Sequence, residues 1–112
     1  MTFIKYDQTQ PTQMRPGVDR RLGYTPNLMT AVIDFNNGPM TAPDPPHAHP
    51  HEQISYVAEG EVIFTVGKES ERLGPGDLVV VPSGIPHTIQ LLTEHARLID
   101  AFTPIRQDFL EG

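Results

Sequence analysis

The chain contains no cysteine and no apolar run of the roughly 18–20 residues that a membrane-spanning helix requires. The absence of cysteine excludes disulfides, thiolate metal ligands and a cysteine nucleophile, so His, Asp, Glu or Gln would have to hold any metal. Residues 1–13 are polar and do not resemble an apolar signal segment. We therefore expect a cytoplasmic protein without a membrane partner, and attention falls on its five histidines.

Basic residues are also few, with 8 Lys and Arg against 14 Asp and Glu, which gives a net charge of −6. Such a charge repels a phosphate backbone, and the pair Arg20-Arg21 is too small a basic cluster to overcome it. We expect no nucleic-acid partner. The 112 residues suffice for one domain. Because a chain of this size buries only about 65% of the surface that its unfolded form exposes, we expect a homodimer.

Long helices are excluded because 12 prolines and 9 glycines interrupt the chain. Short β-rich runs separated by turns take their place, at 28–35, 54–58, 61–66, 78–81, 87–92 and 97–102. The turn at Glu59-Gly60 predicts a hairpin. The unbroken apolar run 78–81 predicts a strand covered on both faces. This pattern indicates an all-β sandwich or barrel.

The expected organisation has three parts. Residues 1–27 form an N-terminal arm or edge strand that crosses to the partner copy, and residues 28–102 form the barrel. Residues 103–112 lose the alternation of apolar and polar side chains and are expected to pack on the barrel or on the partner.

Four polar residues have a spacing that suits a metal site. His47 and His49 lie two residues apart in a proline-rich loop, and on an extended chain such residues share a face, about 7 Å apart at Cα. Gln53 can join them only if the chain turns back near Pro50. His87 follows a rigid proline and glycine turn that would deliver it from another strand. In isolation, a His-x-His pair in such a loop is more often a solvated surface feature than a ligand set, and His51 and Glu52 are alternative ligands.

The combined spacing resembles the cupin superfamily. Its first motif is Gly, five residues, His-x-His, three or four residues, Glu, six residues and Gly. The matching residues are His47, His49, Gln53 and Gly60, with Gln53 replacing the acidic ligand and the leading glycine displaced to Gly38. The second motif is Gly, five residues, Pro-x-Gly, two residues, His, three residues and Asn. The matching residues are Gly76, Pro82, Gly84 and His87, with Leu91 in place of the asparagine.

The resemblance implies a cupin jelly-roll β-barrel with one divalent metal ion, such as Zn, Ni, Mn or Fe, bound in an open site. The implied ligands are His47, His49, Gln53 and His87. With glutamine in place of glutamate, the site keeps the full +2 charge of the ion, which favours an anionic, carboxylate-bearing substrate. The displaced glycine implies a three-residue insertion in the loop, and its segment 40–46 would lie at the rim of the pocket.

Asp100 lies at the centre of the apolar strand 97–102, on the face that carries Leu98 and Phe102. A carboxylate buried without partners has a raised pKa, which is how proteins prepare an acid to carry a proton. The alternative is that Asp100 faces solvent or caps the turn at Thr103-Pro104.

Two strings resemble a narrower group, the small cupins called pectin degradation proteins (KdgF-like). They are His-Pro-His-Glu-Gln-Ile at 49–54 and Leu-Ile-Asp-x-Phe-Thr-Pro-x-Arg-x-Asp-Phe-Leu at 98–110. This resemblance implies a ring-opening reaction of lyase or isomerase type. It would convert 4,5-unsaturated uronates, released by pectin or alginate lyases, into open-chain 5-keto-4-deoxyuronates. It implies Asp100 and Arg106 as catalytic residues, with Phe102 and Arg106 contacting the carboxylated sugar.

Two other functions stay open. The first is another metal cupin enzyme, such as a dioxygenase or a sugar or keto-acid isomerase. The second is a non-catalytic cupin that binds a carboxylated small molecule. Oxygenase chemistry needs a redox-active ion with open positions whereas ring opening needs only a Lewis acid, and turnover separates both enzymes from a binding module.

Overall fold

The structure is a computed structural model that describes residues 2–111. Within these residues the chain forms nine strands, one 3-10 turn and one short helix. The strands are β1 (Thr12–Arg15), β2 (Val18–Tyr24), β3 (Met29–Phe35), β4 (Glu52–Glu59), β5 (Val62–Val66), β6 (Glu69–Leu73), β7 (Leu78–Val81), β8 (His87–Leu91) and β9 (Ala96–Thr103). The 3-10 turn is η1 (Tyr6–Gln8) and the helix is α1 (Gln107–Leu110). The all-β prediction is confirmed.

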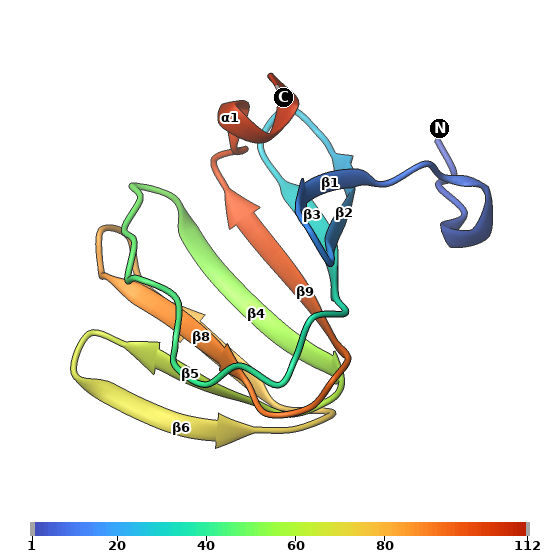
Figure 1. Cartoon of the computed structure of the whole chain (residues 1–112). Helices are drawn as coiled ribbons and strands as arrows, with labels where there is room; N and C mark the ends of the chain where they lie inside the picture. The colour runs from blue at the N-terminus through green and yellow to red at the C-terminus, as the bar shows by residue number, and fades with distance from the viewer. Residues whose placement is uncertain (1, 112) are drawn as a thin grey trace.

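The strands form two antiparallel sheets, one of six strands in the order β1-β2-β3-β9-β4-β7 and one of three in the order β6-β5-β8. Figure 1 shows the smaller sheet on the side of the larger sheet where β4 lies. The helix α1 lies beyond the C-terminal end of β9. Inward-facing apolar side chains form the core, in which Met29, Val57, Val62 and Leu91 are fully buried. No helix in the described part of the chain has the length and apolar character needed to cross a membrane.

The proline-rich loop between β3 and β4 runs beside β8. Backbone hydrogen bonds tie Met40 to Leu91 and Asp44 to Ile89, and His47 and His87 form an isolated antiparallel bridge. Prolines suit this path because they favour an extended backbone and leave few N–H groups to satisfy at a sheet edge. The loop therefore works as an irregular edge that carries His47 to His87.

Alternation along β4 and β9 places polar residues on the inner face at one end of the larger sheet. Gln53, Ser55 and Val57 are buried while the residues between them are exposed, and Asp100 and Phe102 are buried in the same way on β9. The apolar core thus gives way to a polar end, where the site lies.

Two local predictions are wrong. β4 and β5 do not form a hairpin, because β4 pairs with β7 and β9 whereas β5 pairs with β6 and β8. Gly60, at φ 80°, turns the chain from one sheet to the other, and a Cβ there would lie 2.3 Å from the backbone oxygen of His95. β7 is not covered on both faces either, since it is a sheet edge on which Leu78 and Val80 are 61% and 65% exposed.

Candidate metal centre and adjoining cavity

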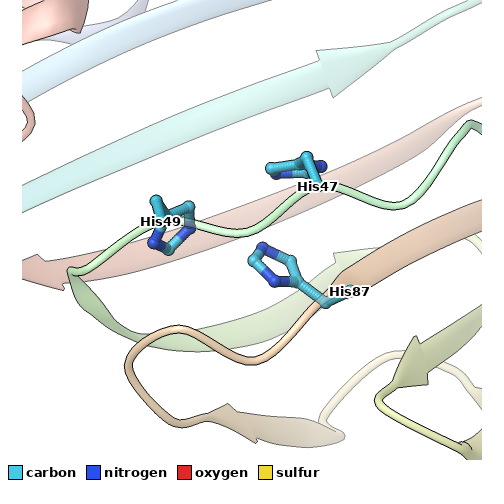
Figure 2. A group of neighbouring side chains, drawn as sticks. All are labelled: His47, His49 and His87. Carbon is cyan, nitrogen blue, oxygen red and sulfur yellow. The ribbon is translucent and has the colours of Figure 1, made fainter.

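Three histidines converge at the polar end of the molecule, as Figure 2 shows. His47 and His49 come from the loop, and His87 begins β8. The nitrogen atoms that could act as ligands all lie within 4.8 Å of one another. The two-way backbone pairing of His47 with His87 (N to O distances of 3.1 and 2.9 Å) fixes this approach. The His-x-His spacing then returns His49 to the same side.

Backbone carbonyls set the tautomers of two of these imidazoles. His87 Nδ1 lies 3.0 Å from the Ile85 oxygen and His49 Nδ1 lies 3.1 Å from the His51 oxygen, so each Nδ1–H donates. The Nε2 lone pairs are left for the site, and the buried His87 Nε2 has no hydrogen-bond partner. Burial, more than any other cause, lowers the pKa of His47 and of His87, which favours the neutral, metal-binding form.

Gln53 brings an amide oxygen to the histidines from the inner face of β4. Its Oε1 lies 3.0 Å from His49 Nε2, and its Nε2 donates to Ser55 Oγ at 2.8 Å. When His49 donates only through Nδ1, its Nε2 and Gln53 Oε1 are both acceptors, and no hydrogen bond joins them. A cation held by both atoms then satisfies both lone pairs. Three imidazoles and one amide oxygen therefore fit a divalent metal ion, whose identity the donor set leaves open.

The alternative ligands lie outside this group. Glu52 is exposed on the outer face of β4, as expected for a residue one position out of register. The ring centroid of His51 is 5.4 Å from that of His49, but His51 does not belong to the cluster of converging nitrogens.

Asp100 faces inward and lies directly opposite Ser55 across β4 and β9. Burial raises its carboxyl pKa from 3.8 to about 6, while a hydrogen bond from Ser55 and the charge of Arg106 act in the opposite direction. The Asp100 Oδ1 atom is buried and has no partner. Asp100 therefore does not face solvent, and it can exchange a proton close to neutral pH.

Arg106 and Phe102 lie beside the histidines. The Phe102 ring meets His49 edge to face with centroids 6.0 Å apart, and the Arg106 guanidinium lies 5.3 Å from the Phe102 centroid. Asp108 occupies part of the Arg106 fork, with Nε to Oδ1 at 3.2 Å and Nη2 to Oδ2 at 2.7 Å. This pairing lowers the pKa of Asp108. Because a guanidinium has five N–H groups, donors remain for a second carboxylate.

The C-terminal segment packs on its own barrel. Phe109 of α1 lies edge to face with Phe102, and the guanidiniums of Arg20 and Arg106 both lie over the Phe109 ring, 4.1 and 4.2 Å from its centroid. Arg20 also donates to the backbone oxygen of Phe109 at 3.1 Å. These contacts hold Arg106 over the polar end of the molecule.

A cavity of about 400 Å³ joins these groups. Residues of interest that line it are His47, Gln53, His87, Asp100, Phe102 and Arg106. At its exposed rim Arg15 pairs with Asp44 of the proline-rich loop at 2.8 Å, so this loop does border the cavity. The volume suits a monosaccharide-sized ligand.

Ser55 was not anticipated from the sequence as part of the site. The signal was present, because Gln53, Ser55 and Val57 occupy alternate positions of one strand and must share a face. A buried serine between a candidate ligand and the core marks a polar network on that face.

Residues 33–102, more than half of the chain, match the family profile described as a cupin domain. The chain belongs to the cupin family. The predicted family and jelly-roll fold are thereby confirmed.

This cupin is 33% identical over 106 residues to the pectin degradation protein KdgF of Dickeya dadantii (strain 3937), covering 93% of this chain and 94% of that protein. The solved structure of KdgF from Halomonas sp. has a TM-score of 0.87 at 34% identity, covering 96% of this chain and 99% of that one. Acireductone dioxygenase of Candida albicans (strain WO-1) is 35% identical over 77 residues, which are 62% of this chain and 43% of that enzyme. The protein is a small cupin that resembles KdgF along nearly its whole length.

Proposed function

We propose that this cupin is a metal-dependent enzyme that opens the ring of 4,5-unsaturated uronates and yields 5-keto-4-deoxyuronates. The KdgF relatives support a substrate derived from pectin, and alginate lyases release uronates of the same chemical type. The observation that carries the proposal is the buried carboxyl of Asp100, which lines the same cavity as His47, His87 and Gln53.

His47, His49, Gln53 and His87 would hold one divalent ion. When bound, this ion would supply Lewis-acid stabilisation of negative charge on an oxygen of the substrate. Imidazole and amide groups carry no charge when they bind a metal ion, so the site would keep a charge close to +2 and attract a carboxylate.

Asp100 would move the proton. In the reaction the hydroxyl on C1 loses its proton, the bond from C1 to the ring oxygen breaks, and C4 gains a proton, so no atom is added or lost. A carboxyl group whose pKa is about 6 can accept and return a proton near neutral pH. Its partner-free Oδ1 is the atom available for this transfer.

Arg106 and Phe102 would orient the sugar. The guanidinium donors that Asp108 leaves free can receive the substrate carboxylate, and the Phe102 ring offers an apolar wall to the sugar ring. The apolar remainder of the cavity, which includes Phe64 and Leu98, excludes water from the enolic product before C4 is protonated.

The test is to give the purified protein a lyase digest of pectin or alginate and to follow the loss of absorbance of the conjugated alkene. We expect loss well above that of a protein-free blank, and no oxygen uptake. The acireductone dioxygenase relative supports a second candidate, oxygenase chemistry, for which oxygen uptake would be the sign. Binding of the uronates without turnover would instead indicate a non-catalytic module.

We also propose that two copies of the chain pair through the outer face of β4 and β7. Ile54 lies opposite Val80 and Tyr56 opposite Leu78, and all four are exposed. These side chains cover a few hundred Å², the upper range for a monomer. A stable dimer buries about 800 Å² per partner.

Sedimentation tests this pairing. We expect a two-chain species for the wild type and a single chain for Val80→Glu, whose charge would lie in the interface but outside the core. A single-chain wild type at micromolar concentration would contradict the pairing.

A further inference from the structure

A row of three inward side chains runs from the candidate ligand set to the candidate proton carrier. Gln53 Nε2 donates to Ser55 Oγ at 2.8 Å, and Ser55 lies directly opposite Asp100 across β4 and β9. Ser55 is fully buried, so no water competes for its hydroxyl.

Hydrogen-bond donation along this row can run in only one direction. The amide NH2 of Gln53 can only donate, so the hydroxyl oxygen of Ser55 accepts and its single hydrogen is free to go to Asp100. A reversed amide would require the Ser55 hydrogen for its own oxygen. The Ser55 hydrogen could then not reach the buried Asp100, whose Oδ1 has no partner, and leaving a buried carboxylate without a donor is costly.

This direction turns Gln53 Oε1 toward His49. Only the oxygen of an amide is a useful metal ligand, because the nitrogen lone pair is delocalised into the carbonyl group. We infer that Ser55 is a positioning residue that holds Gln53 with its oxygen facing the metal site. The inference rests on the proposed metal site and adds a residue that holds a ligand without touching the ion.

The same geometry explains why a glutamine at position 53 needs a neighbour that sets its orientation, whereas a glutamate would not. A carboxylate at position 53 has two equivalent oxygens, so rotation by 180° changes nothing and no neighbouring group is needed to select an orientation. Gln53→Glu is therefore a background in which the role proposed for Ser55 disappears, while the packing of Ser55 is unchanged.

The experiment is a double-mutant cycle on chelator-stripped protein titrated with Zn²⁺ or Ni²⁺ alone, with Kd as the readout. The variants are Ser55→Ala, Gln53→Glu and the double variant. Ser55→Ala removes one buried hydroxyl and little volume, and circular dichroism with thermal unfolding of the stripped proteins verifies the fold. We expect Ser55→Ala to weaken metal binding about 10- to 100-fold in the Gln53 protein. In the Gln53→Glu background we expect the same change to cost less than about threefold.

The outcomes separate the two proposals. Wild-type protein that binds no metal would overturn the ligand set and, with it, the role of Ser55. Wild-type protein that binds metal, with the same loss for Ser55→Ala in both backgrounds or with no loss, would overturn the positioning role and leave the proposed function in place. If Ser55→Ala does not fold, Ser55→Cys, which keeps a weak donor of similar size, replaces it in the same cycle with an intermediate loss expected.

Discussion

Within residues 2–111, metal-ligating side chains gather in two places that differ in their surroundings. His47, His49 and His87 converge at the polar end of the molecule, whereas Asp34, Glu59 and His95 converge on the outer face of the larger sheet. In both groups the potential ligand atoms lie within 4.8 Å of one another. Proximity alone therefore does not distinguish a metal site from a structural cluster.

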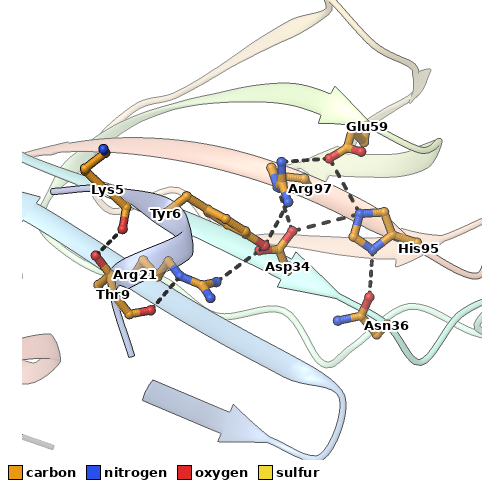
Figure 3. A network of polar contacts seen from close by, with 9 residues as sticks. All are labelled: Lys5, Tyr6, Thr9, Arg21, Asp34, Asn36, Glu59, His95 and Arg97. Carbon is orange, nitrogen blue, oxygen red and sulfur yellow. Dashed lines mark hydrogen bonds and ion pairs between the residues drawn. The ribbon is translucent and has the colours of Figure 1, made fainter. Parts of the chain in front are cut away.

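The difference lies in what already satisfies the lone pairs. In the outer group Arg97 donates to Asp34 at 2.7 Å and pairs with Glu59 at 2.9 Å, and Tyr6 donates to Asp34 at 2.7 Å (Figure 3). Arg21 adds a longer contact to Asp34, and its guanidinium lies 3.9 Å from the Tyr6 ring centroid. The protein supplies its own cations there, and the network ties η1 to the sheet. In the inner group the buried His87 Nε2 has no hydrogen-bond partner, and in the proposed function a divalent ion would supply the cation.

The largest expected effect separates the two groups by metal content. His87→Ala removes a buried donor from the inner group and should lower metal affinity by at least about 100-fold. His95→Ala removes the corresponding histidine of the outer group and should leave one ion per chain. Elemental analysis of both variants after dialysis measures this. Equal metal content in the two variants would contradict the proposal that the inner group, and not the outer one, binds the metal ion.

Turnover should separate the two buried aspartates. Asp100→Asn keeps the size of the side chain but removes the base, so the rate on unsaturated uronate should fall by at least about 100-fold with metal content unchanged. Asp34→Asn should leave the rate within about threefold of wild type. A wild-type rate for Asp100→Asn would make this carboxylate structural.

Stability should respond to the same two substitutions with opposite signs. The pKa of Asp100 is higher in the folded chain, about 6, than the ordinary 3.8, so the native state binds this proton more tightly. Its contribution to the free energy of unfolding is fully present below about pH 4 and is lost as the pH rises through 6, by roughly 3 kcal/mol. The Asn side chain does not titrate. The free energy of unfolding of Asp100→Asn, relative to that of the wild type, should therefore rise by about that amount between pH 4 and pH 7.5.

Urea unfolding of the metal-free proteins across this pH range measures the difference. Asp34→Asn breaks a buried ion pair with Arg97 and should lose roughly 2–4 kcal/mol at pH 7.5. A stability difference between Asp100→Asn and wild type that does not change with pH would contradict the assignment of the raised pKa.

The smallest effect concerns two arginines, one in each region, that each pair with a carboxylate of the protein. Arg106→Lys keeps the charge but loses the planar fork, so KM should rise about tenfold with kcat within about threefold. Arg97→Lys, in the outer network, should leave KM unchanged. Steady-state kinetics of both variants measure the two KM values. Equal KM values would contradict a role for Arg106 in substrate binding.

The sequence predicts the convergence of His47, His49 and His87 and the cupin architecture, but not the pairing of individual strands. The spacing of His47, His49 and His87 and the carboxylate of Asp100 within an apolar strand were enough to propose a site, because a short loop and a period of two restrict where these side chains point. The exposure of Val80 could not be predicted, because the same apolar run occurs in a central strand and in an edge strand that a partner could cover.

Longer-range features were missed for a related reason. Whether β4 pairs with β5 or with β9 depends on contacts between segments about 40 residues apart, for which the turn at Gly60 carries no information. The roles of Arg20 and Ser55 likewise depend on neighbours from other strands, Phe109 and Asp100.

The most direct test of the metal-dependent function is to strip the wild-type protein with a chelator and restore one divalent ion in steps, measuring turnover of the lyase digest and bound metal together. We predict that turnover is lost on stripping, rises in proportion to bound metal and reaches its maximum at one ion per chain. Turnover that survives complete stripping, or that does not return when one ion per chain is bound, would contradict the account.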